Sequence, residues 1–189
     1  MDALKYRLLL GLLLLLTGGA GFAGTGTDQS VPVEKVRVAR IKAAFLYHFA
    51  QFSAWPEEAL GDAAMPIRLC ILGKDPFGSA LEQLQGKTVH NRPLEIRHLP
   101  VGASARGCHL VFMGPMPKQV LQTSLKQLQN QPVLTVGEGE DFLKQGGIVR
   151  LVEEKNRVRF EINVMAARRA GLQLSARLLR LARIYEEAG

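Results

Sequence analysis

The two cysteines are the residues of this sequence whose types and spacing most clearly suggest chemistry. Cys70 lies in the apolar run 67–72, and Cys108 begins a second run that ends at Phe112. Both runs are typical of buried strands. If the chain is exported and the two strands are neighbours, the thiols would form one disulfide across 38 positions. Two inert buried thiols are the alternative, and too few other ligands accompany them for a metal site.

Motifs of nucleotide-binding and hydrolytic enzymes are present only in incomplete form. Residues 73–78 (Gly-Lys-Asp-Pro-Phe-Gly) stand where a phosphate-binding loop would, but Ser79-Ala80 replaces the required Lys-Ser/Thr pair. Residues 102–106 (Gly-Ala-Ser-Ala-Arg) are similar to a nucleophile elbow but end in arginine instead of glycine. A turn and a loop are the better interpretations, so the sequence favours a binding protein over an enzyme.

The histidines and acidic residues do not form a metal-binding pattern. The four histidines lack the three- or four-residue spacing of a helical metal site, and residues 138–141 lack the regular spacing of a calcium loop. We therefore expect no metal and no cofactor. The histidines are His48, His90, His98 and His109.

The strongest candidate recognition region begins at residues 157–163 (Arg-Val-Arg-Phe-Glu-Ile-Asn), where charged and apolar side chains alternate. Five arginines on the two helices predicted after it form what we call the basic ridge. The ridge is either a solvated surface whose charges suit helix ends or a docking surface for an acidic partner. The members of the basic ridge are Arg168, Arg169, Arg177, Arg180 and Arg183.

Five residues of this region are our predicted partner-binding residues. The strand contributes the first three, although a strand-to-helix junction would also need them for structural reasons. The basic ridge contributes the other two. They are Phe160, Glu161, Asn163, Arg168 and Arg177.

Residues 1–23 have the features of a secretory signal peptide. Lys5 and Arg7 precede an apolar run over residues 8–16, and small residues lead to a cleavage site near Ala23. The run is shorter than the roughly 20 residues that span a bilayer, and an uncleaved anchor is the alternative. We therefore predict an exported protein.

Composition and charge narrow the class further. Of the 189 residues, 47% are hydrophobic and 22% charged, as in one globular domain. Cleavage would remove Lys5, Arg7 and Asp2, which lowers the 24 basic and 17 acidic side chains to 22 and 16 and the net charge from +7 to +6. An exported chain without a nucleic-acid-binding motif is not expected to bind nucleic acid. The charge points instead to an acidic protein or a membrane surface.

The remaining sequence alternates apolar strands with amphipathic helices. Residues 24–34 are predicted to be a flexible start and residues 35–187 one domain. Apolar residues at three- and four-residue steps predict a helix from about 35 to 52, which Trp55-Pro56 ends. The second half of this helix is apolar nearly all round, which indicates burial in the core or in a dimer contact.

The further elements predict a single-domain α/β sandwich with a mixed, largely parallel sheet flanked by helices. Asn163 and Ser175 are the predicted N-caps of the last two helices. In the final helix, Leu178, Leu181 and Ile184 are predicted core residues. Strands are predicted at 67–72, 88–89, 94–98, 109–113, 133–136, 148–152 and 157–162, and helices at 79–85, 118–130, 164–170 and from 176.

An ordered set of short motifs resembles the YfiR family of periplasmic proteins. Each motif is modest alone, but together they cover nearly the whole chain after the signal peptide. The motifs lie at residues 41–56, 69–73, 75–78, 106–109, 132–136, 146–148, 159–163 and 174–179.

The resemblance implies a small periplasmic α/β protein, often dimeric and without a catalytic role, in which Cys70 and Cys108 match the bridged cysteines of the family. Members of known role repress a membrane diguanylate cyclase by binding its periplasmic sensor domain, which lowers cyclic di-GMP and biofilm formation. The second cysteine pair of other members is absent, so no redox switch built on that pair is implied here.

The implied partners are the periplasmic domain of such a cyclase, a second copy of the chain, and an outer-membrane lipoprotein that antagonises repression. Two alternatives stay open beside this prediction. One is a small-ligand receptor that uses the loops after Leu72 and Met113. The other is a hydrolase with an unrecognised site.

Overall fold

The structure is a computed structural model that describes residues 33–155 and 157–187, all within one compact unit, Val31–Gly189. The predicted signal peptide and most of the predicted flexible start lie outside the described residues. Within the described part of the chain, no helix is both long enough and apolar enough to cross a membrane.

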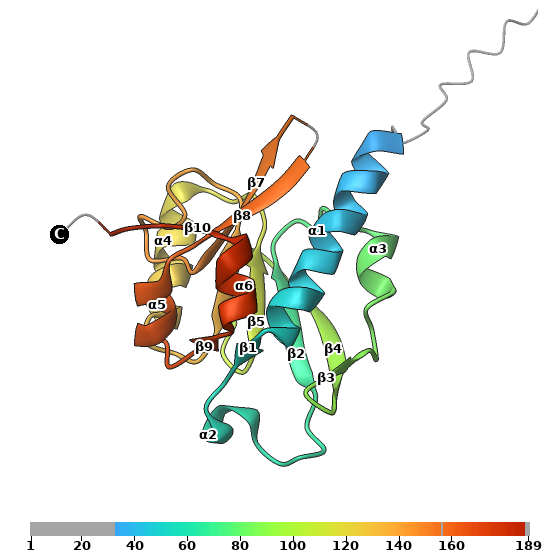
Figure 1. Cartoon of the computed structure of the whole chain (residues 1–189), viewed down its shortest axis with the longest axis vertical. Coiled ribbons are helices and arrows are strands. Elements are labelled where there is room, and N and C mark those ends of the chain that lie inside the picture. The colour runs from blue at the N-terminus through green and yellow to red at the C-terminus, as the bar shows by residue number, and fades with distance from the viewer. Residues whose placement is uncertain (1–32, 156, 188–189) are drawn as a thin grey trace, which may run out of the picture. The chain divides into compact units, whose positions relative to one another are not determined.

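Eight strands of the described residues form one curled sheet in the order β10-β8-β7-β6-β5-β2-β4-β3 (Figure 1). The five strands from β7 to β4 in this order run parallel, whereas β8 is antiparallel to β7 and β3 is antiparallel to β4. The predicted mixed, largely parallel sheet is therefore confirmed. The strands are β2 (Ile67–Leu72), β3 (Thr88–Val89), β4 (Arg92–Leu99), β5 (Leu110–Met113), β6 (Leu134–Gly137), β7 (Val149–Glu154), β8 (Arg157–Ile162) and β10 (Arg183–Ile184).

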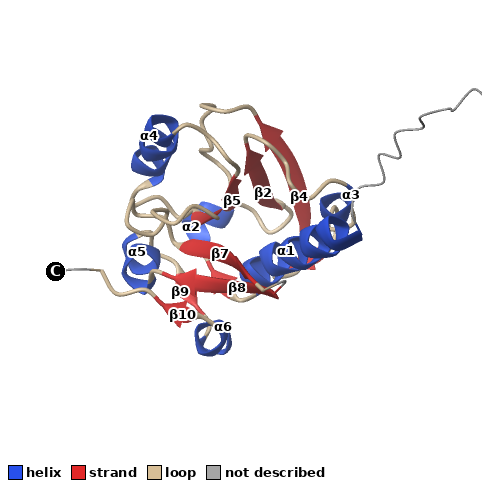
Figure 2. Cartoon of the chain, turned by 90° about the horizontal axis from the view of Figure 1, so that it is seen from above, coloured by secondary structure: helices blue, strands red, loops and turns tan. Residues whose placement is uncertain are grey.

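Helices cover both faces of this sheet, as the predicted α/β sandwich requires. Helix α1 lies inside the curl and α4 lies on the opposite side (Figure 2), whereas the buried residues of α5 and α6 belong to the same hydrophobic cluster as α1. The helices are α1 (Val33–Gln51), α2 (Glu57–Leu60), α3 (Ser79–Glu82), α4 (Lys118–Leu128), α5 (Val164–Arg169) and α6 (Ala176–Leu181).

Strand β2 shows how the sheet separates two hydrophobic clusters. Successive side chains of a strand point to opposite faces. Ile67, Leu69 and Ile71 belong to the cluster that contains α1, and Cys70 and Leu72 belong to the cluster that contains α4. All five are at most 1% exposed. This two-sided burial explains why the strand is an unbroken apolar run in the sequence.

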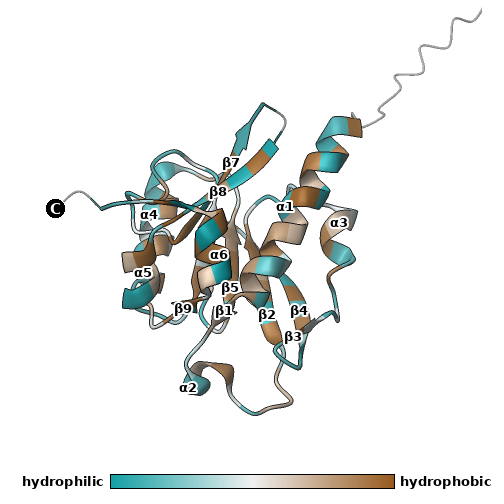
Figure 3. Ribbon diagram, in the orientation of Figure 1, coloured by the Kyte–Doolittle hydropathy of each residue, from teal (hydrophilic) through white to brown (hydrophobic). Residues whose placement is uncertain are grey.

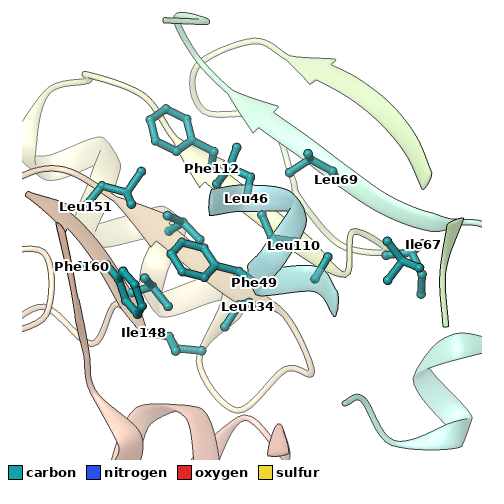
Figure 4. Close-up of a cluster of buried hydrophobic side chains, with 14 of the residues drawn as sticks. Leu46, Phe49, Ile67, Leu69, Leu110, Phe112, Leu134, Ile148, Leu151 and Phe160 are labelled. Atoms are coloured by element: carbon teal, nitrogen blue, oxygen red, sulfur yellow. The ribbon is translucent and has the colours of Figure 1, made fainter. Parts of the chain in front are cut away.

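The second half of α1 is buried against the sheet. Leu46 and Phe49 are fully buried and point toward side chains of the central strands (Figure 4). Phe160 of β8 packs edge-on against Phe45 and Phe49, with ring centroids 5.3 and 5.1 Å away. Of the two explanations that the sequence left open for this apolar segment, burial in the core is therefore confirmed.

The predicted disulfide between Cys70 and Cys108 is present. Its two Cα atoms are 6.0 Å apart, and the bridge spans 38 positions. Cys108 stands two residues before β5, the direct neighbour of β2. The bridge thus joins β2 to the segment that enters β5, on the face that α4 covers.

The predicted core positions of α6 are only partly correct. Leu178 is buried, with 2% of its surface exposed, but Leu181 is 71% and Ile184 49% exposed. The prediction was wrong because the helix ends at Leu181 and the chain becomes extended in β10, so Ile184 does not continue the helical stripe.

Sequence patterns also missed the shortest elements. Strand β1 (Ser53–Ala54) pairs antiparallel with β9 (Gln173–Leu174), and β10 pairs parallel with the end of β8. Each of these strands has two residues, which is too few to show an alternating pattern. Their positions depend on contacts between distant parts of the chain.

Breaking the disulfide should strongly destabilise the fold. In the chain-entropy description, the loop closed by Cys70 and Cys108 contributes about 4 kcal/mol to the free energy of unfolding. We expect urea unfolding with a reductant to show a loss of this order. The C70A/C108A double variant should be less stable than the oxidised protein and insensitive to reductant. Equal stability of the oxidised and reduced wild type would contradict this role of the bridge.

Gly147 lies against the Phe142 ring and should not tolerate replacement by a larger residue. The Phe142 ring is buried, and a Cβ atom at Gly147 would lie 2.2 Å from it. We expect Gly147→Ala to lower the free energy of unfolding by about 1–3 kcal/mol through overpacking. Gly139→Ala is the matched control, because no atom lies within 4 Å of the added Cβ there. Urea unfolding of both variants tests this, and similar effects in the two would argue against overpacking.

Candidate functional site

The predicted partner-binding residues of β8 and its junction with α5 form contacts with other residues of the same chain. Phe160 is 4% exposed within the aromatic contacts of α1. Asn163 is fully buried and is the N-cap of α5, as predicted: its Oδ1 accepts a hydrogen bond from Ala166 N–H at 2.9 Å. Its Nδ2 donates to Glu187 Oε1 at 2.8 Å. Both side chains therefore shape the fold next to the surface.

Glu161 forms an ion pair with Arg150 across the β7–β8 hairpin. Its carboxylate accepts hydrogen bonds from Arg150, which lies directly opposite on β7, at 2.9 Å. Both side chains are less than one fifth exposed. Arg150 also donates to the backbone oxygen of Glu140, so the pair connects the hairpin to the turn after β6. A contact of Glu161 with a partner stays a prediction.

Arg168 and Arg177 are the two predicted partner-binding residues whose side chains are exposed. They stand on different helices, α5 and α6. The Arg177 guanidinium lies over the ring of Phe52, 5.3 Å from its centroid. This cation–π contact holds the guanidinium against the ring of the residue that follows α1. The structure therefore places these two residues at the surface, apart from the three engaged on β8 and its junction.

Two cations of the basic ridge are neutralised within the chain. Arg169 pairs with Glu187 at 2.5 Å, and Arg183 pairs with Glu154 at 2.8 Å. The hydrogen bonds from Arg169 and Asn163 lower the pKa of Glu187 to about 2. Among the described residues, the remaining ridge members have no carboxylate partner. They are Arg168, Arg177 and Arg180.

The exposed part of α6 and β10 combines apolar side chains with arginines that have no carboxylate partner among the described residues. Leu181 and Ile184, which the sequence assigned to the core, lie in the same short segment as Arg177 and Arg180. Figure 3 shows hydrophilic and hydrophobic residues side by side along α6. Exposed apolar side chains that adjoin charges are typical of protein-binding surfaces. We call these four residues the α6–β10 surface.

The loops after Leu72 and Met113, which the receptor alternative would use, are in backbone contact. The Gly114 N–H donates to the carbonyl of Leu72 at 3.0 Å, and a Cβ at Gly114 would lie 2.4 Å from the carbonyl oxygen of Lys74. Glycine is therefore needed at this close approach. The receptor alternative stays a prediction.

Within residues 33–155 and 157–187, no group of three or more histidine, cysteine, aspartate or glutamate side chains is placed to hold a metal ion.

The turn at residues 73–78 is closed by Asp75, whose Oδ1 accepts hydrogen bonds from the N–H groups of Phe77 and Gly78. Ordinary turn chemistry thus accounts for that motif.

His109 is a buried polar junction at the amino ends of β2 and β5. Its Nδ1 accepts a hydrogen bond from Arg68 N–H at 2.9 Å, so its Nε2 carries the proton and donates to the carbonyl of Ala59 at 3.0 Å. The Trp55 indole N–H donates to the His109 carbonyl at 3.0 Å. Burial lowers the pKa of His109, and the charges of Arg68 and Arg92 lower it further against the opposing bond to Ala59.

Together, the fold and these contacts define a small disulfide-bridged α/β protein. Its exposed apolar side chains beside arginines on α6 and β10 are suited to binding another molecule. The comparison with protein families agrees with this class. The family described as YfiR/HmsC-like matches residues 39–183. The chain therefore belongs to the YfiR/HmsC-like family, and the resemblance noted in the sequence is confirmed.

The buried, neutral state of His109 should make the fold sensitive to acid. Because the pKa of His109 is lower in the folded than in the unfolded protein, the unfolded protein binds the proton more readily. This residue should therefore cost no stability above its ordinary pKa of 6.5 and an increasing amount as the pH falls below it.

Urea unfolding of the wild type and His109→Asn at pH 7.5 and 5.5 tests this, since asparagine Oδ1 can still accept the Arg68 N–H. We expect a smaller loss of unfolding free energy in the variant over this interval. The other three histidines are present in both proteins, so their contribution cancels in the difference. An equal pH dependence of the two proteins would show that His109 is not the sensitive group.

Proposed function

We propose that this chain is a periplasmic regulatory protein that represses an inner-membrane diguanylate cyclase by docking on its periplasmic sensor domain. Membership of the YfiR/HmsC-like family is the observation that carries this proposal. The pattern of residues 1–23 supports export, and one disulfide is what an oxidising compartment permits. The protein lowers cyclic di-GMP and biofilm formation through this contact and not through catalysis.

The α6–β10 surface is the part of the chain that we propose docks on the cyclase. Leu181 and Ile184 supply apolar contact area that the fold leaves in water, and Arg180 has no carboxylate partner among the described residues. Apolar side chains at the centre of a contact provide affinity, whereas peripheral charges mainly set the encounter rate and orientation. The sensor-domain surface should therefore be apolar with acidic residues around it.

The predicted residues Phe160, Glu161 and Asn163 support this surface from within. In the backbone register of the two parallel strands, Ile162 of β8 lies beside Ile184 of β10, and Glu161 lies beside Arg183. The core contacts of Phe160 and the cap at Asn163 hold the strand that positions β10. Substitutions at these three residues would consequently affect docking through the fold as well as through any direct contact.

Deletion of the gene should raise cellular cyclic di-GMP, because the cyclase would lose its repressor. Complementation with the wild-type gene should restore the lower level. The measurement is quantification of cyclic di-GMP by mass spectrometry in cells that express the cognate cyclase. Unchanged cyclic di-GMP in the deletion strain would refute the proposed function.

Polar substitution of the α6–β10 surface should release the cyclase without unfolding the regulator. Leu181 is mostly exposed, so L181S combined with I184S should lower stability little while removing apolar contact area. We expect the double variant to lose most co-purification with the sensor domain and to leave cyclic di-GMP near the deletion level. Met65→Ser, at a residue 44% exposed between α2 and β2, is the matched control and should repress normally.

Thermal unfolding and periplasmic abundance should be measured for each of these variants. Loss of repression in a folded, abundant double variant supports the docking surface. Full repression by the folded double variant would place the contact elsewhere on the protein.

A further inference from the structure

A hollow of about 330 Å³ opens at the amino ends of β2, β5 and β6, away from the α6–β10 surface. This volume lies at the lower end of the roughly 300–1,000 Å³ of small-molecule sites. Its lining contains two arginines and no carboxylate side chain. The polar side chains of the lining are Arg68, Arg106, His109 and Gln131, and Cys108 adjoins them.

Arg68 is only partly satisfied by the protein. Its Nη1 donates to the carbonyl of Gly107 at 3.1 Å, which lays the guanidinium along the hollow. Its Nε is buried and has no hydrogen-bond partner. The carboxylate of Glu95 lies 3.5 Å from this Nε, and its other oxygen is held by Arg97 at 2.8 Å. A buried donor without an acceptor is costly, so an additional acceptor here would be stabilising.

Arg106 brings a second positive charge to the same hollow. Its side chain is exposed, and within the described part of the chain it has no hydrogen bond or ion pair. Gly107 and Cys108 follow it directly, and the disulfide to Cys70 anchors this segment against β2. The Gly107 carbonyl thus orients the Arg68 guanidinium, the bridge anchors the segment that carries Arg106, and both arginines line the same opening.

Apart from Glu95, which forms an ion pair with Arg68 Nε at 3.5 Å, the described groups around the lining supply no carboxylate to the hollow. His109 is neutral because its Nδ1 accepts the Arg68 N–H and its pKa is lowered. The charge of Arg92 also lowers the pKa of His109. The Arg92 guanidinium donates hydrogen bonds to the backbone carbonyls of Leu60, Asp62 and Met65. The lining of the hollow therefore carries two cations and no carboxylate of its own.

We infer that this hollow is a binding site for a small anion that presents a carboxylate or a phosphate group to Arg68 and Arg106. A planar guanidinium donates two parallel hydrogen bonds to either group, and the charge-assisted bonds are stronger than neutral ones. The amide side chain of Gln131 can bind the remainder of such a molecule. The site differs from the loops after Leu72 and Met113, which lie at the carboxyl ends of the strands, and it does not depend on the proposed docking to a cyclase.

The test is calorimetric titration and thermal unfolding of the oxidised chain after removal of residues 1–23. The probes are inorganic phosphate and succinate, each compared with sodium chloride at the same ionic strength. A ligand that binds only the folded state raises the unfolding midpoint with concentration. We expect phosphate or succinate to raise the unfolding midpoint more than sodium chloride does. The anion that raises it more shows whether the site prefers a phosphate or a carboxylate group.

Arg106→Ala removes one cation from an exposed loop and should weaken binding about fivefold or more without loss of the fold. Arg157→Ala, at an exposed residue of β8, removes the same charge elsewhere and should leave the affinity unchanged. The inference is overturned if neither anion exceeds the chloride effect, if Arg106→Ala binds as the wild type does, or if Arg157→Ala loses as much affinity.

Discussion

The packing of α1 into the curl of the sheet is the contact on which the rest of the structure depends. Phe49 and Leu46 have no exposed surface, and they lie between strands from both halves of the sheet. The buried residues Ala166 and Ala167 of α5 and Leu178 of α6 belong to the same hydrophobic cluster as α1. Helix α6 buries Leu178 in this cluster and leaves Leu181 in water.

The amino ends of the central strands are held by a second, polar set of contacts. His109 links β2 to α2 through its two ring nitrogens, and the carbonyl of the same residue receives Trp55 N–H and Leu134 N–H. The disulfide at the preceding residue fixes this segment covalently. These contacts account for the burial of this histidine, and they anchor the backbone from which Arg68 and Arg106 extend.

Several charged residues of the candidate region are used for internal structure. Glu161 pairs with Arg150, and Glu187 joins the cap of α5 to Arg169. What is left at the surface is a small set of cations beside apolar side chains. Such a surface is suited to binding another protein, and this agrees with a chain of the YfiR/HmsC-like family.

Patterns in the sequence were sufficient to predict the α/β class, the long first helix, most of the longer strands and the N-caps Asn163 and Ser175, and they favoured the disulfide over two free thiols. These features depend on local periodicity, on cap chemistry or on the small number of possible partners. The outward position of Leu181 in α6, the pairing of two-residue strands from distant segments, and the hollow that Arg68 and Arg106 share became visible only in the folded structure. Burial and charge pairing at those places arise from residues far apart in the chain, and no local pattern records them.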